Sequence, residues 1–410
     1  MCIRDRSVTI SQEVRFVVMG DNRPMFPVEK QPYVFYKIVE KIVELKPDAI
    51  FSTGDLILGG GNKAENDRMF DEFLKVVEKF KDIPFYIAPG NHDIEDKIES
   101  KEQYVKKFGA TYKSVDIENC HFILLSSEEP GEKGKITGKQ FQWLTEGLEK
   151  AKQKDHTFIF IHRPLYPKIG HIGSSLDRFP EERDKLTILL KKYNPDMVFV
   201  GHTHIFNYSV IDGLHQMITG GAGAPLYSKA PEYGGFFHFI YVIVKRKDVD
   251  YRIVPVEDEI SIAADLRKKG NFQESIEVSK KAIGIMPEHP QPYLSATLGY
   301  YYLKDSLNYQ KSYQKLVEKQ GSENEALLNL GFTSLRIDRK IDTAEKFFKK
   351  AIEINSENFI PYYMLGGIYS TKRNYENALK YYNKALEPVS YTHLRAHETS
   401  LHLVCRLLLE

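Results

Sequence analysis

The first part of the chain, from residue 14 to about residue 256, alternates between short apolar runs and longer amphipathic stretches. The short runs have the length of β-strands and end at polar or glycine-containing segments, which favours buried strands. The longer stretches place apolar residues at helical spacing, as with Ile38, Ile42 and Leu45. We therefore expect strands at 14–19, 48–52, 84–88, 122–125, 158–161 and 197–200, and helices at 32–45, 66–80, 140–151 and 183–193.

Helical spacing stops after Gly201, and the next apolar runs are separated by turns such as Asp212-Gly213. The alternation of strands and helices before that point indicates an α/β domain. Beyond it we expect antiparallel strands at 206–211, 216–218, 236–244 and 251–254.

Five of the apolar runs end at a polar motif that contains potential metal ligands. Open α/β sheets bind ligands at the carboxyl ends of their strands, so we expect these side chains to meet. Carboxylate, amide oxygen and imidazole groups suit Zn²⁺, Mn²⁺ or iron. The motifs are GDNR at 20–23, GDLI at 54–57, GNHD at 90–93, IFIH at 159–162 and GHTH at 201–204, and their candidate ligands are Asp21, Asp55, Asn91, His162, His202 and His204.

From Ile260 onward the pattern is helical and periodic, and the related positions Ala351 and Ala385 lie 34 residues apart. This period, with paired helices, resembles the tetratricopeptide (TPR) repeats. The resemblance implies an all-α solenoid of about four repeats over 257–387, the last truncated and the third with one extra residue in its turn. Its concave surface would bind a protein or peptide partner. An unrelated helical bundle is the alternative, which the period and the repeat motif together disfavour.

The composition excludes few classes of function. The formal net charge of the 410 residues is +1, which gives no indication of a nucleic-acid-binding protein. The longest apolar runs, such as 122–125 and 158–161, fall well short of the roughly 20 residues of a membrane helix. Cys120 lies in a strand-like segment, where a cysteine is expected to act as a small buried apolar residue.

Both ends of the chain differ in character from the rest. The segments at 1–7 (MCIRDRS) and 388–410 resemble translated sequencing-adapter read-through, and we exclude them from the fold prediction. A natural disordered tail is the alternative for the second segment. Cys2 and Cys405 fall in these segments, and the cellular compartment stays open because the natural start is expected to be missing.

The five motifs, in this order and each after a strand, resemble those of the calcineurin-like metallophosphoesterases, and we assign residues 8–256 to such a domain. The resemblance implies an α/β sandwich of two mixed β-sheets flanked by helices, with two divalent metal ions (Mn, Fe or Zn). It implies that Asp55 bridges both ions, that Asp21 and His204 hold one, and that Asn91, His162 and His202 hold the other. His92 would donate a proton or hydrogen bond to the leaving oxygen of the ester.

Arg23 departs from the family pattern, which usually has Asp-x-His where this chain has Asp21-Asn22-Arg23. An arginine stays protonated and cannot ligate a cation, so the first metal is short of a histidine. Arg23 could instead bind a phosphoryl oxygen, or it could point outward and only begin the loop before Pro24. Among the other histidines, His171 in the loop after His162 is the one that merits a test.

The expected function is hydrolysis of a phosphomonoester or phosphodiester by a metal-bound hydroxide at a binuclear site, with the TPR repeats serving protein interaction. The alternative is a TPR binding or scaffold protein whose phosphoesterase domain is weakly active or inactive, an alternative that Arg23 favours. The sequence Gly220-Gly221-Ala222-Gly223 is expected to form a tight turn beside the site and not a phosphate cradle, because no helix clearly follows it.

Overall fold

The computed structural model describes residues 13–387. The segments 1–7 and 388–410, with Cys2 and Cys405, lie outside the described residues. The described chain forms two compact units. One contains the chain up to Met25 together with Val34–Gly59 and Lys63–Val256, and the other contains Phe26–Tyr33, Gly60–Asn62 and the chain from Glu257 onward.

The first unit contains two mixed β-sheets, as the sequence predicts. The first sheet has the strand order β11-β10-β1-β2-β3, with β1, β2 and β3 parallel and β10 antiparallel to both of its neighbours. The second sheet has the order β4-β5-β6-β7-β9-β8. The first-sheet strands are β1 Glu13–Met19, β2 Ala49–Ser52, β3 Phe85–Ile87, β10 His238–Lys245 and β11 Asp248–Pro255.

The second sheet differs from the prediction in two respects. Strand β9 is antiparallel to β8, as expected, but it also pairs in parallel with β7. The edge strand β4 is not predicted, because its residues are half-buried or exposed and form no apolar run. The strands are β4 Lys113–Ile117, β5 Cys120–Leu124, β6 His156–Ile161, β7 Met197–Val200, β8 Phe206–Ile211 and β9 Leu214–Thr219.

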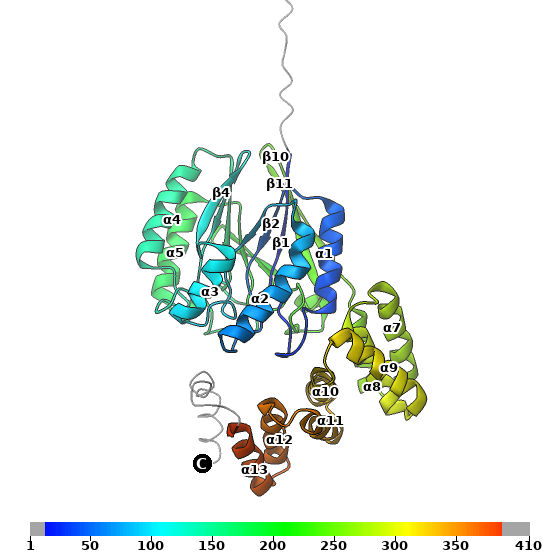
Figure 1. Ribbon diagram of the computed structural model, residues 1–410. Helices are drawn as coiled ribbons and strands as arrows, with labels where there is room; N and C mark the ends of the chain where they lie inside the picture. The colour runs from blue at the N-terminus through cyan, green and yellow to red at the C-terminus, as the bar shows by residue number, and fades with distance from the viewer. Residues whose placement is uncertain (1–12, 388–410) are drawn as a thin grey trace, which may run out of the picture. The chain divides into compact units, whose positions relative to one another are not determined.

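Helices cover the outer face of each sheet, giving the predicted sandwich (Figure 1). One core lies between the first sheet and α1, α2 and α3, and another lies between the second sheet and α4 and α5. Helix α3 is absent from the prediction, because little of its surface is buried and its apolar pattern is weak. The helices are α1 Tyr33–Leu45, α2 Lys63–Val77, α3 Ile98–Phe108, α4 Gly138–Ala151 and α5 Pro180–Tyr193.

A third core of aromatic side chains joins the two sheets face to face. The ring of Phe16 packs edge-on against Phe51, Phe122 and Phe158, with centroids 5.6, 5.1 and 4.9 Å apart. Because both faces of the central strands are covered, these strands appear in the sequence as continuous apolar runs. The same packing brings the carboxyl ends of β1, β2 and β3 near those of β6 and β7.

The second unit consists of helices that pack in sequential pairs. Small residues allow close approach within a pair, since a Cβ added to Gly331 would lie 2.6 Å from the Phe348 ring and one added to Gly366 would lie 2.6 Å from that of Tyr382. Five π-helical residues, Thr333–Ile337, follow α10, which accommodates the extra residue in that repeat. The helices are α6 Glu259–Lys268, α7 Phe272–Ile285, α8 Pro290–Leu303, α9 Ser306–Gln320, α10 Glu323–Phe332, α11 Ile341–Ile354, α12 Phe359–Thr371 and α13 Tyr375–Leu386.

Among the described helices, none combines the length and the apolar character needed to cross a membrane.

Candidate metal centre

The six predicted metal ligands all come together at the strand ends of the first unit. Each follows a strand of the sandwich: β1, β2 and β3 of the first sheet, and β6 and β7 of the second. Five of the six are buried, with exposed fractions of 0–4%. Buried carboxylates require ion pairs, hydrogen bonds or a bound cation, and buried neutral imidazoles require hydrogen-bond partners or a bound cation. The six residues are Asp21, Asp55, Asn91, His162, His202 and His204.

One group of donors contains Asp21, Asp55 and His204, whose ligand atoms all lie within 4.8 Å of one another. The Nε2 atom of His204 is 3.5 Å from Oδ1 of Asp21. Its other nitrogen, Nδ1, donates to the carbonyl of Pro225 at 2.7 Å. That bond keeps the proton on Nδ1 and leaves the lone pair of Nε2 directed at the carboxylates, as a metal ligand requires.

A second group surrounds Nε2 of His162. This atom lies 3.1 Å from Oδ1 of Asn91, 3.2 Å from Nδ1 of His202 and 3.4 Å from Oδ1 of Asp55. Ligand atoms at about 2.1 Å from one cation are themselves separated by about 3.0–3.4 Å, so each of these three atoms is close enough to Nε2 of His162 to share a cation with it. Nδ1 of His162 donates to the carbonyl of Thr53 at 2.8 Å, which again leaves Nε2 free to ligate. Asp55 therefore belongs to both groups.

Three of the predicted ligands have left-handed backbone conformations, which are uncommon outside glycine. The φ angles are 60° at Asp21, 58° at Asp55 and 67° at His202. Such strain costs on the order of 1–3 kcal/mol for each residue and is concentrated at functional sites. The residue before His202 is a glycine for a steric reason, because a Cβ on Gly201 would lie 2.5 Å from Oδ2 of Asp21.

Asp93, the last residue of GNHD, orients the backbone of the Asp55 motif, although the sequence interpretation gave it no role. Its carboxylate accepts the backbone N–H groups of Asp55 and Leu56, both at 2.9 Å, and that of Gly90 at 2.8 Å. Burial and the neighbouring Asp55 carboxylate raise the pKa of Asp93 above its usual range. Its position in the motif is the signal that could have identified it.

The Asp55 carboxyl is held in its ionised form. Burial would raise its pKa, but the charges of His162, His92 and Arg23 outweigh burial and lower the pKa below the usual value. The backbone N–H of His92 also donates to Oδ1 of Asp55 at 3.0 Å. An ionised carboxylate is the form that bridges two cations.

Arg23 is placed at the site and does not extend into solvent. Its backbone N–H donates to the carbonyl of Asp55 at 3.1 Å, and its side chain is only 16% exposed. The buried Nε atom lies 3.7 Å from Oδ2 of Asp55 and has no hydrogen-bond partner within the described chain. Of the two roles considered from the sequence, this geometry favours the one at the phosphoryl group.

His92 lies at the open side of the centre. Its side chain is 30% exposed, and Nε2 is 3.9 Å from Oδ2 of Asp55. Nδ1 contacts the carbonyl of Leu58 as a donor, so Nε2 is the atom directed toward the site. Burial lowers the pKa of the imidazole by more than the Asp55 carboxylate raises it.

A buried ion pair beside His202 is a feature that sequence reasoning missed. Nε and Nη2 of Arg163 contact the two oxygens of Glu128 at 2.6 and 3.0 Å, and Nη1 lies 3.1 Å from Nε2 of His202. The exposed fractions of Arg163 and Glu128 are 5% and 0%. The arginine directly after His162 was a visible signal, but its partner 35 residues earlier was not.

The Arg163→Met substitution is expected to lower the free energy of unfolding of this unit by about 3–5 kcal/mol, because the Glu128 carboxylate stays buried without a charged partner. The double substitution Arg163→Met, Glu128→Gln should recover most of that loss. Urea unfolding followed by the fluorescence of the only tryptophan, Trp143 in α4, measures both. Equal losses in the single and double variants would contradict the pairing.

His171 and Tyr227 form an exposed edge of the centre. The His171 ring stacks on that of His202, with centroids 3.8 Å apart, and its Nε2 contacts the Tyr227 hydroxyl. The Tyr227 ring lies 5.1 Å from that of His204, and the residue is 45% exposed. Burial and the charge of His204 lower the pKa of His171 to about 4. The pair therefore offers a neutral, aromatic surface beside the metal ligands.

The segment Gly220–Gly223 forms a tight turn beside Asp21. The N–H groups of Ala222 and Ala224 donate to the carbonyls of Gly20 and Asp21 at 3.0 and 2.8 Å. A Cβ on Gly220 would lie 2.4 Å from the carbonyl oxygen of Thr203, so the turn leaves no room for a side chain there.

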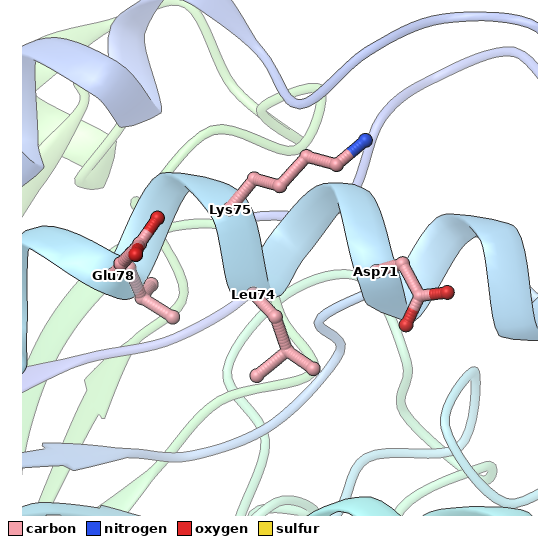
Figure 2. Close-up of a pocket in the computed structure, with 5 residues that line it drawn as sticks. Asp71, Leu74, Lys75 and Glu78 are labelled. Carbon is pink, nitrogen blue, oxygen red and sulfur yellow. The ribbon is translucent and has the colours of Figure 1, made fainter.

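A shallow depression on the surface of the first unit is formed by residues other than those of the candidate metal centre. It is lined by Asp71, Leu74, Lys75, Val77 and Glu78, which belong to α2 and the short 3-10 helix that follows it (Figure 2). The side chains in Figure 2 extend from one helix surface and include none of the predicted site residues.

Comparison with known proteins gives two family matches. Residues 14–206 match the calcineurin-like phosphoesterase family, and residues 361–387 match the tetratricopeptide repeat. The chain is 32% identical over 164 residues to a probable glycerophosphodiester phosphodiesterase of Arcobacter nitrofigilis, covering 39% of this chain and 57% of that protein. It is 27% identical over 149 residues to purple acid phosphatase 23 of Arabidopsis thaliana, covering 31% of each.

These matches span at most 57% of the length of those two relatives. Among solved structures, a dimetal phosphatase from Danio rerio superposes with a TM-score of 0.42 at 14% identity, covering 60% of this chain and 99% of that one.

Proposed function

We propose that this chain, which carries a calcineurin-like phosphoesterase domain followed by a tetratricopeptide repeat, is a metal-dependent hydrolase of phosphomonoesters or phosphodiesters. The observation that carries the proposal is the pair of donor groups that share Asp55, one with Asp21 and His204, the other with His162. A protein that only bound a partner would have no need for two buried, adjoining sets of metal donors.

The donor chemistry is that of two divalent cations, Mn, Fe or Zn. Asp21, Asp55 and His204 would hold one ion, and Asn91, His162 and His202 would hold the other together with Asp55. When bound, the cations supply charge that neutralises the phosphoryl oxygens and lowers the pKa of a coordinated water. The described residues near the centre offer no nucleophilic side chain in the ligand motifs, so no covalent ester of the protein is expected.

His92 is proposed to donate a proton from Nε2 to the leaving oxygen when its ring is in the imidazolium form, because Nδ1 carries the proton of the neutral ring. Its Nδ1 is engaged by the carbonyl of Leu58, which orients the ring, and its exposed edge allows a substrate to reach Nε2. An alkoxide is a poor leaving group unless it is protonated as the bond to phosphorus breaks.

Arg23 is proposed to bind a non-bridging phosphoryl oxygen. The Arg23→Ala variant should raise KM by about tenfold to a hundredfold while metal content stays near that of the unmodified protein, since a charge-assisted hydrogen bond contributes about 1.5–3 kcal/mol. KM and bound metal are measured on the same preparation. The Arg23→Lys variant keeps the charge without the planar guanidinium, so its KM should lie between those of the unmodified protein and the Arg23→Ala variant. Loss of metal with unchanged KM would assign Arg23 to the metal site instead.

The second candidate function is a TPR binding or scaffold protein with a weakly active or inactive phosphoesterase domain. The arginine at position 23, in place of the family's usual histidine, favours it, and the repeats imply a protein or peptide partner under either function. Retention of His92 and of all the donors around His162 disfavours it.

Hydrolysis of p-nitrophenyl phosphate and bis(p-nitrophenyl) phosphate, with added Mn²⁺ or Zn²⁺ and with chelator, distinguishes the two functions. The hydrolase proposal expects turnover of at least one ester that is lost with chelator and restored by metal. If neither ester is hydrolysed by protein that has bound two ions, the scaffold function is favoured.

A further inference from the structure

The segment Phe26–Tyr33 belongs to the helical repeat unit, although it lies far from the repeats in the sequence. It follows the motif that contains Asp21 and Arg23, and only Pro24 and Met25 separate Arg23 from Phe26. A second short segment with the same membership, Gly60–Asn62, follows the motif of Asp55. The loop after β1 and the loop after β2, which follow the motifs of Asp21 and Asp55, therefore each contribute a short segment to the repeat unit.

Side chains of three successive repeat helices hold the segment. The Phe26 ring stacks on Phe332 at the end of α10, with centroids 4.8 Å apart and planes at 12°. Nε2 of Gln320, at the end of α9, donates to the carbonyl of Val28 at 3.1 Å. In the opposite direction, Nζ of Lys30 in the segment donates a hydrogen bond to the carbonyl of Lys319 at 3.1 Å.

The beginning of α8 holds the other end of the segment. Nδ1 of His289 accepts the N–H of Gln291 as a helix cap at 3.3 Å, so Nε2 carries the proton and donates to the carbonyl of Gln31 at 3.0 Å. Burial lowers the pKa of His289 to about 4, which keeps the ring neutral. Oε1 of Gln291 accepts the N–H of Tyr33 at 2.8 Å.

Most of these bonds reach main-chain groups of the segment, so they depend little on which side chains the segment carries. Here the held segment is part of the same chain, so its local concentration is set by covalent linkage. The ring of Pro24 restricts φ at the step between the segment and Arg23.

We propose that the repeats bind Phe26–Tyr33 as an internal ligand and thereby position Arg23 for the phosphoryl group of the substrate. Gln291 and Gln320 are then positioning residues that act through the segment. The proposal rests on the proposed function in assigning phosphate binding to Arg23. It gives the repeat unit a part in substrate binding that is additional to any partner.

The test uses the full chain with the double substitution Gln291→Ala, Gln320→Ala. The matched control is Gln273→Ala, Gln310→Ala, which changes two exposed glutamines of the same unit. Three quantities are measured: hydrogen exchange of the amides in 26–33, the Kd of inorganic phosphate for the metal-loaded protein, and KM and kcat for bis(p-nitrophenyl) phosphate. Metal content is checked in each variant.

The expected result is faster exchange of the segment, by about tenfold, because two hydrogen bonds that hold it are lost. The Kd of phosphate and the KM should rise together by about threefold to tenfold, with kcat and metal content little changed and the control variant like the unmodified protein. Gln291→Glu alone keeps the acceptor for the N–H of Tyr33 and should retain the unmodified exchange rate at that amide.

Two results would overturn the proposal: an unchanged exchange rate in the double variant, or faster exchange with unchanged phosphate affinity. The exchange and phosphate measurements need no turnover, so they remain decisive if the unmodified protein hydrolyses neither ester. In that case the proposed hydrolysis fails while the coupling between repeats and site is still measured. If the metal-loaded protein binds no phosphate at all, the proposed hydrolysis and the proposed coupling between repeats and site are both rejected.

Discussion

Replacing Asp55 with alanine is expected to abolish hydrolysis and to reduce bound metal to below one ion per chain. Asp55 is the donor common to both groups, with Oδ1 at 3.4 Å from Nε2 of His162 and a carboxylate oxygen within 4.8 Å of Asp21 and His204 donors. A catalytic cation contributes several kcal/mol to the transition state, so turnover should fall by at least about three orders of magnitude. Metal analysis and ester hydrolysis on one preparation measure both effects.

Asp116→Ala is a suitable control for this substitution, because that side chain is 52% exposed on β4 and its partner is His121. It should leave metal content and turnover unchanged. An Asp55→Ala protein that folds, as judged by Trp143 fluorescence, and still binds two ions would show that the bridging position is wrongly assigned.

Replacing His92 with alanine should leave both ions in place and slow hydrolysis by about a hundredfold to ten-thousandfold for esters whose leaving group is an alkoxide. An ester of p-nitrophenol should be slowed far less, because its leaving oxygen needs little protonation. The measurement is the dependence of kcat/KM on the pKa of the leaving group, which should steepen in the variant.

His215→Ala provides the comparison for His92, since His215 lies on β9 with its Nδ1 against the Tyr208 hydroxyl and belongs to no ligand motif. If His92→Ala slows all esters by the same factor, His92 does not donate the proton. A loss of metal in that variant would place it among the ligands.

The sequence predicted which side chains lie together at the strand ends more fully than it predicted the strands and helices around them. Each ligand follows a strongly apolar strand, and strands of this kind are recognisable because both of their faces are buried. The local motif also fixes the backbone: the glycine before Asp21, Asp55 or His202 belongs to a strained turn that holds the side chain at the strand end. Such information is contained in a few neighbouring residues.

Features that depend on distant pairings were missed. The pairing of Arg163 with Glu128 joins two loops, and neither residue is distinguished by its local pattern. Strand β4 and helix α3 are stabilised mainly by their neighbours and carry weak apolar periodicity. The inclusion of Phe26–Tyr33 in the repeat unit depends on contacts with residues from 258 to 306 positions away, which no local pattern encodes.

Two unequal metal sites that share Asp55 should load one after the other, and a metal titration combined with a turnover assay detects this order. Chelator-treated protein is titrated with Mn²⁺ while bound metal and hydrolysis of bis(p-nitrophenyl) phosphate are measured together. We expect two ions per chain, the weaker one at Asp21 and His204, where Arg23 stands in place of a histidine ligand. Turnover should appear only as this second ion binds. Full turnover with one ion bound, or two bound ions without turnover of any ester, would contradict the assignment of two catalytic metal sites that share Asp55.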